Sequence, residues 1–190
     1  MTRPVLLLCL LVPALGACHR QAPCDLVEGV VGQGCVSGQS AFRVKATIAA
    51  IASNGVAVGL MSDPLECKGA LTRSSPGMAR LKRQPGSSTI DLVVFLPTGV
   101  TVSPDRYPIT NSDERVGTGT WASIDHIPEG EPKPSISRMA RKGWIVIEEI
   151  SDLRIRGNFD LSFDADGGEP AARISGAFDG QYCEPHGLLD

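Results

Sequence analysis

The stretch LRIRGNFDLSF, residues 153–163, decides the fold of this chain. Its odd positions are apolar or glycine and its even positions are polar, without a break. The odd positions are Leu153, Ile155, Gly157, Phe159, Leu161 and Phe163, and the even positions are Arg154, Arg156, Asn158, Asp160 and Ser162. This period of two predicts a β-strand with one buried face and one wet face, which is typical of antiparallel sheets.

The same alternation extends to both sides of this stretch. Residues 172–182 alternate in the same way after a connection at 164–171, which predicts a long hairpin. Upstream, two alternating runs flank Ser53-Asn54-Gly55, and Asn-Gly is a strong hairpin signal. These two runs are 42–48 and 56–60. Further strands are expected at 89–96, 106–110, 116–124 and 143–150, and only 135–142 is compatible with a short helix. The sequence predicts an all-β fold, an antiparallel β-sandwich or barrel of about eight strands with long loops.

Composition agrees with a single turn-rich domain. The 190 residues include 21 Gly and 14 Pro, which favours many short connections and excludes a helical bundle. The 18 Lys and Arg are balanced by 21 Asp and Glu, giving a net charge of −3. Because a nucleic-acid binder needs clustered positive charge, we expect no nucleic-acid partner.

Two long irregular stretches, 73–88 and 125–142, are rich in Pro, Gly, Ser and charge. Loops of this length are often binding loops, and otherwise they are solvated, variable connections. We expect any protein partner to bind there.

The first residues are typical of an export signal. Arg3 precedes an apolar run at 5–15, which is too short to span a bilayer. The run ends in Leu15-Gly16-Ala17-Cys18, which resembles the lipobox of bacterial lipoprotein precursors. The alternative is an ordinary cleaved signal peptide.

The lipobox resemblance implies cleavage before Cys18 and attachment of a diacylglyceryl group and an acyl chain to that cysteine, enough for stable anchoring. The chain then divides into a signal peptide at 1–17, a lipidated tether at 18–23 and one β domain at 24–190. His19 stands where many such proteins of the inner membrane carry aspartate. We therefore expect a location in the cell envelope, on the outer membrane.

Four cysteines remain after the signal and the lipid site: Cys24, Cys35, Cys67 and Cys183. An even number in an exported domain predicts disulfides, with three possible connectivities. We favour Cys24–Cys35 with Cys67–Cys183, because the second bond would hold the C-terminal strand to the rest of the domain. A zinc site is the alternative, but the sequence has no C-x-x-C pair and no suitably spaced histidines.

The C-terminal half also resembles a family. A Gly-rich strand beginning at Gly143-Trp144 is followed by Ile155-Arg156-Gly157-Asn158-Phe159 and by Ile174-Ser175-Gly176-Ala177-Phe178, with Cys183 at the end, and Asp105-Arg106-Tyr107-Pro108-Ile109 lies upstream. This arrangement resembles uncharacterised exported bacterial lipoproteins of the myxobacterial kind. The resemblance implies fold and location and carries no activity.

Catalytic chemistry is weakly represented. Of three histidines, His19 lies in the tether, His126 in a long loop and His186 in the C-terminal tail, none beside a recognisable nucleophile motif. Asp125-His126 would be a dyad only if a serine approached it in space.

Two further stretches superficially match ligand motifs. Residues 117–122 fit a dinucleotide fingerprint but lack the helix that must follow. Residues 164–169 open like a calcium loop but lack the spacing to a bidentate glutamate. The aromatics Trp121, Trp144, Tyr107 and Tyr182 fall in expected strands and favour packing over a sugar platform. We expect no metal and no cofactor.

Three functions remain open. The first is a non-catalytic, lipid-anchored binding or structural module of the cell envelope. The second is a small-ligand carrier with an apolar cavity inside a barrel. The third is an envelope hydrolase, which would need His126 or His186 beside a serine or carboxylate.

Overall fold

The computed structural model describes residues 26–28, 30–39, 42–52, 54–67, 71–74, 78–81, 85–110, 118–130, 136–166 and 168–183. These residues form twelve β-strands, and no helix occurs among them. The strands are β1 (Gln33–Gly38), β2 (Ala46–Ala52), β3 (Gly55–Met61), β4 (Leu71–Ser74), β5 (Met78–Leu81), β6 (Ser88–Phe95), β7 (Asp105–Pro108), β8 (Gly119–His126), β9 (Ile136–Met139), β10 (Lys142–Ile150), β11 (Arg154–Phe163) and β12 (Ala172–Tyr182). The predicted all-β fold is confirmed.

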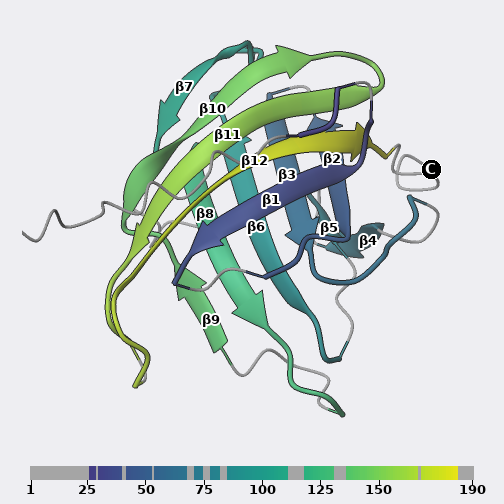
Figure 1. Ribbon diagram of the computed structural model, residues 1–190. Helices are drawn as coiled ribbons and strands as arrows, with labels where there is room; N and C mark the ends of the chain where they lie inside the picture. The colour runs from purple at the N-terminus through teal and green to yellow at the C-terminus, as the bar shows by residue number, and fades with distance from the viewer. Residues whose placement is uncertain are drawn as a thin grey trace, which may run out of the picture.

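Ten of these strands form one sheet, which curls strongly into a half-barrel (Figure 1). The order is β7-β10-β11-β12-β2-β3-β6-β8-β9, and β1 pairs with β12 beside β2. The β4–β5 hairpin forms a separate two-stranded sheet. The predicted hairpins β2–β3 and β11–β12 are both present, with continuous antiparallel registers.

One pairing departs from the antiparallel sheet that the sequence predicts. β12 pairs in parallel with β2 through Gln181↔Ile48 and Tyr182↔Ala49, so the sheet is mixed. The reason is that β12 is long enough to serve two neighbours along one edge. Its first part pairs with β1 between Ile174 and Asp179, which leaves its last residues for β2.

Backbone hydrogen bonds link the two ends of the curled sheet. Thr110, just after β7, donates its N–H to the carbonyl of Thr120 in β8 at 2.9 Å. Ala140 donates to Ala122 of β8, and Arg141 donates to Ser162 of β11. The run from β9 into β10 therefore passes from one end of the sheet to the other, which satisfies backbone groups that an open edge would expose.

The concave face of the sheet holds the main hydrophobic core. β11 alternates along its whole length as the sequence predicts, with every second side chain buried. Phe159, Phe178 and Leu60 are among the largest fully buried side chains. These side chains lie in the interior of the curl.

Two phenylalanines explain the paired I-x-G-x-F motifs. In the β11–β12 register, Gly157 lies opposite Phe178 and Phe159 lies opposite Gly176. A Cβ added at Gly157 would lie 2.7 Å from the Phe178 ring, and one added at Gly176 would lie 2.6 Å from the Phe159 ring. Each ring therefore covers the glycine of the neighbouring strand, which is the aromatic–glycine pairing known to stabilise sheets.

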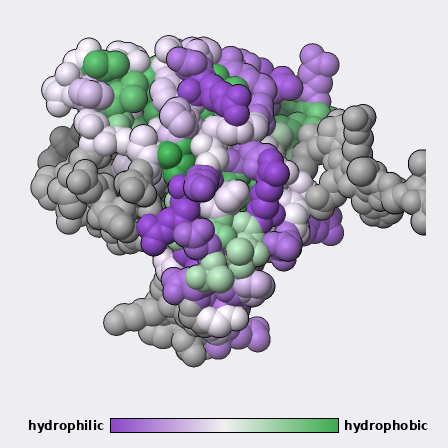
Figure 2. All heavy atoms as spheres, turned by 90° about the vertical axis from the view of Figure 1, so that its left-hand side faces the viewer, coloured by the Kyte–Doolittle hydropathy of each residue, from purple (hydrophilic) through white to green (hydrophobic). Residues whose placement is uncertain are grey.

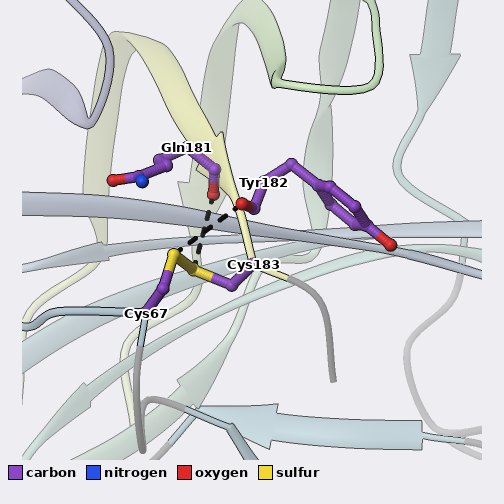
Figure 3. Close-up of a disulfide and its surroundings, with 4 residues drawn as sticks. All are labelled: Cys67, Gln181, Tyr182 and Cys183. Carbon is purple, nitrogen blue, oxygen red and sulfur yellow. Dashed lines mark hydrogen bonds between the residues drawn. A yellow bond between two sulfur atoms is a disulfide. The ribbon is translucent and has the colours of Figure 1, made fainter. Parts of the chain in front are cut away.

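A smaller apolar cluster lies against the disulfide that joins Cys67 to Cys183 (Figure 3). Its buried members are Ala46, Ile48, Met61 and Cys183, with Leu65 and Cys67 packed against them. The two sulfurs lie 3.7 Å and 3.8 Å from the carbonyl oxygens of Tyr182 and Gln181. The predicted Cys67–Cys183 bond is confirmed, and it holds the end of β12 to the chain that follows β3.

The second predicted disulfide involves a residue outside the described part of the chain. Cys35 in β1 is disulfide-bonded. Cys24, its expected partner, lies outside the described residues, so the pairing Cys24–Cys35 stays a prediction.

Two local expectations are wrong, and one strand was not predicted. The expected helix at 135–142 is instead β9, because β8 has a free edge that Ile136–Met139 pairs with. The expected irregular stretch at 73–88 contains most of the β4–β5 hairpin. The sequence also gave no sign of β1, whose six residues include two glycines and lack alternation.

Candidate functional site

A serine and a histidine form a cross-strand pair where one expected partner loop ends and the other begins. Ser88 is the first residue of β6 and His126 the last residue of β8, and they lie directly opposite each other. Ser88 Oγ lies 3.1 Å from His126 Nδ1, and both residues are half-buried. The structure thus brings a serine to His126, as a hydrolase would require.

Within the described residues, the neighbouring Asp125 does not complete a catalytic triad with this pair. Asp125 is adjacent to His126 in a strand and therefore points to the opposite face. There it is buried and accepts a hydrogen bond from Ser123 Oγ at 3.4 Å. The two side chains of Asp125-His126 therefore do not form the dyad that the sequence left open, and within the described residues the His126 ring is hydrogen-bonded to Ser88.

The backbone donors nearest to Ser88 are already used. Its own N–H donates to Ser62 Oγ at 2.8 Å. The N–H of Ile127 donates to Ser87, and that of Gly86 donates to Ile127. An oxyanion hole needs free donors beside the nucleophile, and these groups do not supply them.

The two expected partner loops, far apart in sequence, lie side by side at this pair. Besides the ladder between Gly86, Ser87 and Ile127, a Cβ added at Gly86 would lie 3.6 Å from the Glu129 side chain. Residues 85–86 and 129–130 are exposed. We call residues 85–88 with 126–130 the paired loops. In Figure 1 they lie at the lower edge of the molecule, below β6 and β8.

The outer face of β10, β11 and β12 carries a network of ion pairs. Arg154 binds Glu149 in a two-pronged contact at 2.9 Å and 3.2 Å, and its other nitrogen lies 3.5 Å from Asp179. A register shift in β10 after Ile147 leaves Glu148 to contact Arg156 at 3.7 Å. Most of these charges are therefore paired with each other.

Asp179 is the unusual member of this network. Its residue is only 3% exposed, and its Oδ1 accepts no hydrogen bond from the described residues. Burial raises the pKa of the Asp179 carboxyl, against the opposing effect of Arg154 and Arg156. In contrast, the hydrogen bond from Arg154 lowers the pKa of Glu149. Sequence alternation marked Asp179 as an outward polar residue, and nothing in it signalled burial.

A second buried charge, Arg138, holds the β11–β12 connection. Its Nη2 donates to the carbonyls of Asp164 and Pro170 at 2.5 Å and 2.9 Å, and its guanidinium lies 5.7 Å from the centre of the Phe163 ring. Arg138 lies in β9, which the sequence did not predict as a strand. Its role could therefore not be anticipated.

The stretches that resembled ligand motifs have ordinary local structures. In the part of 117–122 that is described, Gly119 begins β8. Asp166 and Glu169 exchange backbone hydrogen bonds at the tip of the β11–β12 hairpin. No group of three or more potential metal-ligating side chains occurs among the residues that the structure describes.

The two tryptophans and two tyrosines are half-buried along the strands. Arg106 of β7 lies 4.6 Å from the centre of the Trp144 ring on the neighbouring strand. The Tyr107 hydroxyl donates to the carbonyl of Ser103 at 2.7 Å. Trp121 and Tyr182 are also half-buried, in β8 and β12.

Several predicted residues lie outside the described part of the chain, namely Cys18, His19, Cys24 and His186. In the described part, no helix is long and apolar enough to cross a membrane. On the face shown in Figure 2, hydrophobic residues form small groups among hydrophilic ones.

Comparison with protein-family models, with curated proteins and with solved structures finds no match to this chain.

Proposed function

We propose that the protein is a non-catalytic binding module of the cell envelope, anchored by lipid at Cys18 on the outer membrane. The observation that carries the proposal is the disulfide between Cys67 and Cys183. Disulfides persist in oxidising compartments and are rare in the cytosol. The Leu15-Gly16-Ala17-Cys18 sequence supplies a route to such a compartment and a site for the anchor.

Membrane fractionation tests the anchor. With Cys18 replaced by serine, the protein should lose its lipid and move from the membrane fraction to the soluble fraction. Cys9→Ser is the matched control, because this cysteine lies in the proposed signal peptide and should be removed with it. Retention of the Cys18→Ser variant in the membrane fraction, to the same extent as the control, would contradict the proposal.

The paired loops are the proposed partner-binding surface. Their support is that two separate chain segments converge there and expose residues 85–86 and 129–130. A photo-crosslinking residue at Glu129 should form an adduct with an envelope protein in intact cells. Glu169, exposed at the tip of the β11–β12 hairpin, is the matched control position. Equal crosslinking at both positions, or none at Glu129, would argue against this surface.

A carrier of small apolar ligands is less well supported. Such a carrier needs space inside the curled sheet, where this chain buries Phe159 and Phe178 beside many aliphatic side chains. We therefore expect no saturable binding of a fluorescent fatty acid. Saturable binding that is lost on substituting a core residue would favour the carrier.

A hydrolase is the second candidate, because Ser88 Oγ contacts His126. The occupied N–H donors and the position of Asp125 argue for a structural cross-strand pair. A fluorophosphonate probe, which labels activated serines, should therefore not react with the protein. Labelling that disappears in Ser88→Ala but persists in Ser37→Ala would establish the hydrolase instead.

A further inference from the structure

Exposed apolar side chains gather where the chain enters the domain. Five large apolar residues are exposed among those described, and three of them lie in one short segment: Val27, Val30 and Val31, at 64%, 47% and 39%. A fourth, Leu153, is the most exposed, at 76%. The fifth, Val100, lies in the connection between β6 and β7.

Backbone pairing brings Leu153 to the same place as the valines. The end of β12 lies between them, because Leu153 accepts a hydrogen bond from the N–H of Tyr182 and Gly32 donates to the carbonyl of Asp179. Two strand spacings, about 10 Å, separate the flanking segments across β12, and the two contacts lie three residues apart along it. Figure 1 shows the N-terminal segment beside the turn between β10 and β11, at the upper right. We call Val27, Val30, Val31 and Leu153 the valine patch.

The valine segment is fixed in position by its own hydrogen bonds. Gln33 Oε1 accepts the N–H of Val27 at 2.9 Å, and Gln33 Nε2 donates to the carbonyl of Val30 at 2.7 Å. The valines are therefore held outward by a defined loop. Isolated exposed valines need no explanation, but four large apolar residues gathered at one site mark an interaction surface.

The position of the patch along the chain indicates what covers it. Val27 lies only nine positions after Cys18, and nine residue steps span at most about 30 Å. A lipid on Cys18 would keep the patch within this distance of the bilayer surface.

We propose that the valine patch is a second membrane contact, which inserts into the bilayer surface beside the lipid anchor and orients the domain. The proposal rests on the anchor at Cys18 proposed above. The anchored domain would then lie with the β10–β11 turn toward the membrane. The paired loops, at the lower edge in Figure 1, would point away from the membrane. Valine and leucine side chains suit such shallow contact because each gains free energy on leaving water.

Hydrogen exchange on the full-length lipidated protein tests this contact. The protein is compared in vesicles of phosphatidylethanolamine with a minority of phosphatidylglycerol and in detergent micelles without vesicles. Exchange at 27–32 and 151–153 should slow in vesicles, by about tenfold or more if the backbone leaves water. The connection around Val100 is the internal control and should not change.

The variant Val27→Ser/Val30→Ser/Leu153→Ser provides a second measurement. It should remain in the vesicle pellet through its lipid and lose the protection at both segments. Val100→Ser is the matched control and should keep the protection. Normal folding of each variant is checked from exchange in β11 and β12.

The outcomes separate this inference from the proposed anchor. Sedimentation of the wild type with vesicles but unchanged exchange at the patch would leave the anchor in place and overturn the second contact. Failure of the wild type to sediment would overturn the anchor and, with it, this inference. Protection that appears without vesicles, or that rises with protein concentration, would show that the chain's own termini or a second copy cover the patch, and would also overturn it.

Discussion

Gly157 and Gly176 have no space for a side chain. A Cβ at Gly157 would overlap the carbonyl oxygen of Val146, and one at Gly176 would overlap that of Cys35. Neither residue has a positive φ, so the requirement for glycine is steric and does not come from backbone conformation. The I-x-G-x-F motifs thus record close approaches between neighbouring strands, each covered by a phenylalanine ring.

A side chain at these glycines should destabilise the protein more, the more closely its Cβ would approach neighbouring atoms. We expect Gly157→Ala to lower the free energy of unfolding by about 3 kcal/mol, as overpacking of a filled core does. Gly180→Ala is the matched control on β12, since its Cβ would meet the Ala49 side chain at 3.2 Å and can be accommodated with a small shift. Urea unfolding measures both. Equal effects of the two substitutions would contradict this explanation of the motif.

Asp179 should give stability a characteristic dependence on pH. Its pKa in the folded protein is raised above the usual 3.8 by burial. The folded state therefore favours the protonated carboxyl. The stability of the wild type relative to Asp179→Asn should be greatest below pH 3.8 and should fall as the pH rises through the raised pKa. Chemical unfolding across this range measures the difference, and a difference that stays constant or rises would contradict the account.

Glu149 should behave in the opposite way. Its hydrogen bond with Arg154 lowers its pKa below the usual 4.5, so the ionised form is favoured in the folded protein. The contribution of Glu149 should be present above pH 4.5 and lost as the pH falls through the lowered pKa. The Glu149→Gln variant, measured in the same series, should therefore show the reverse slope to Asp179→Asn. If the stability differences of the two variants from the wild type changed with pH in the same direction, this account of Glu149 and Asp179 would be contradicted.

At the scale of elements, the alternation of apolar and polar residues was sufficient to predict strands that have one buried face. β11 could be predicted because its buried positions alternate without interruption. β12 could be predicted because apolar residues or glycine recur at every second position, although the burial of Asp179 beside Phe178 interrupts the alternation there. β9 could not, since its four residues owe their conformation to pairing with β8. Its Arg138 is buried, whereas a charged residue in a strand is expected to face solvent. Burial is possible because Arg138 donates hydrogen bonds to two carbonyls of the β11–β12 connection.

The Cys67–Cys183 disulfide should contribute much of the stability. It closes a loop of 116 residues, for which loop entropy alone predicts about 4–5 kcal/mol. The Cys67→Ala/Cys183→Ala variant should therefore unfold at much lower urea concentration than the wild type. Cys35→Ala is the matched control: if Cys35 pairs with Cys24, it closes a far shorter loop and should cost less. A greater loss for Cys35→Ala would contradict this ordering.

For the candidate site, the sequence indicated which residues and loops to consider, but not how they are arranged in space. It directed attention to His126 and to both loops, and the structure brings parts of these loops together beside Ser88. The partnership with Ser88 could not be predicted, because it depends on the register between β6 and β8. Likewise, the valine patch depends on β12 bringing the turn at Leu153 toward a segment more than 100 residues earlier in the chain.

At the scale of the whole molecule, the account assigns two surfaces to one short-tethered domain. The valine patch would face the membrane to which Cys18 is attached, and the paired loops would face a partner. The curled sheet between them is held together by its hydrophobic core and by the disulfide. Both assignments depend on the anchor, since an untethered domain has no fixed membrane side.

The most direct test of that anchor is the intact mass of the protein purified from its native membranes. We predict a mature chain that begins at Cys18 and carries the added mass of a diacylglyceryl group and an amide-linked acyl chain. A chain that begins elsewhere, or a Cys18 without lipid, would contradict the central claim.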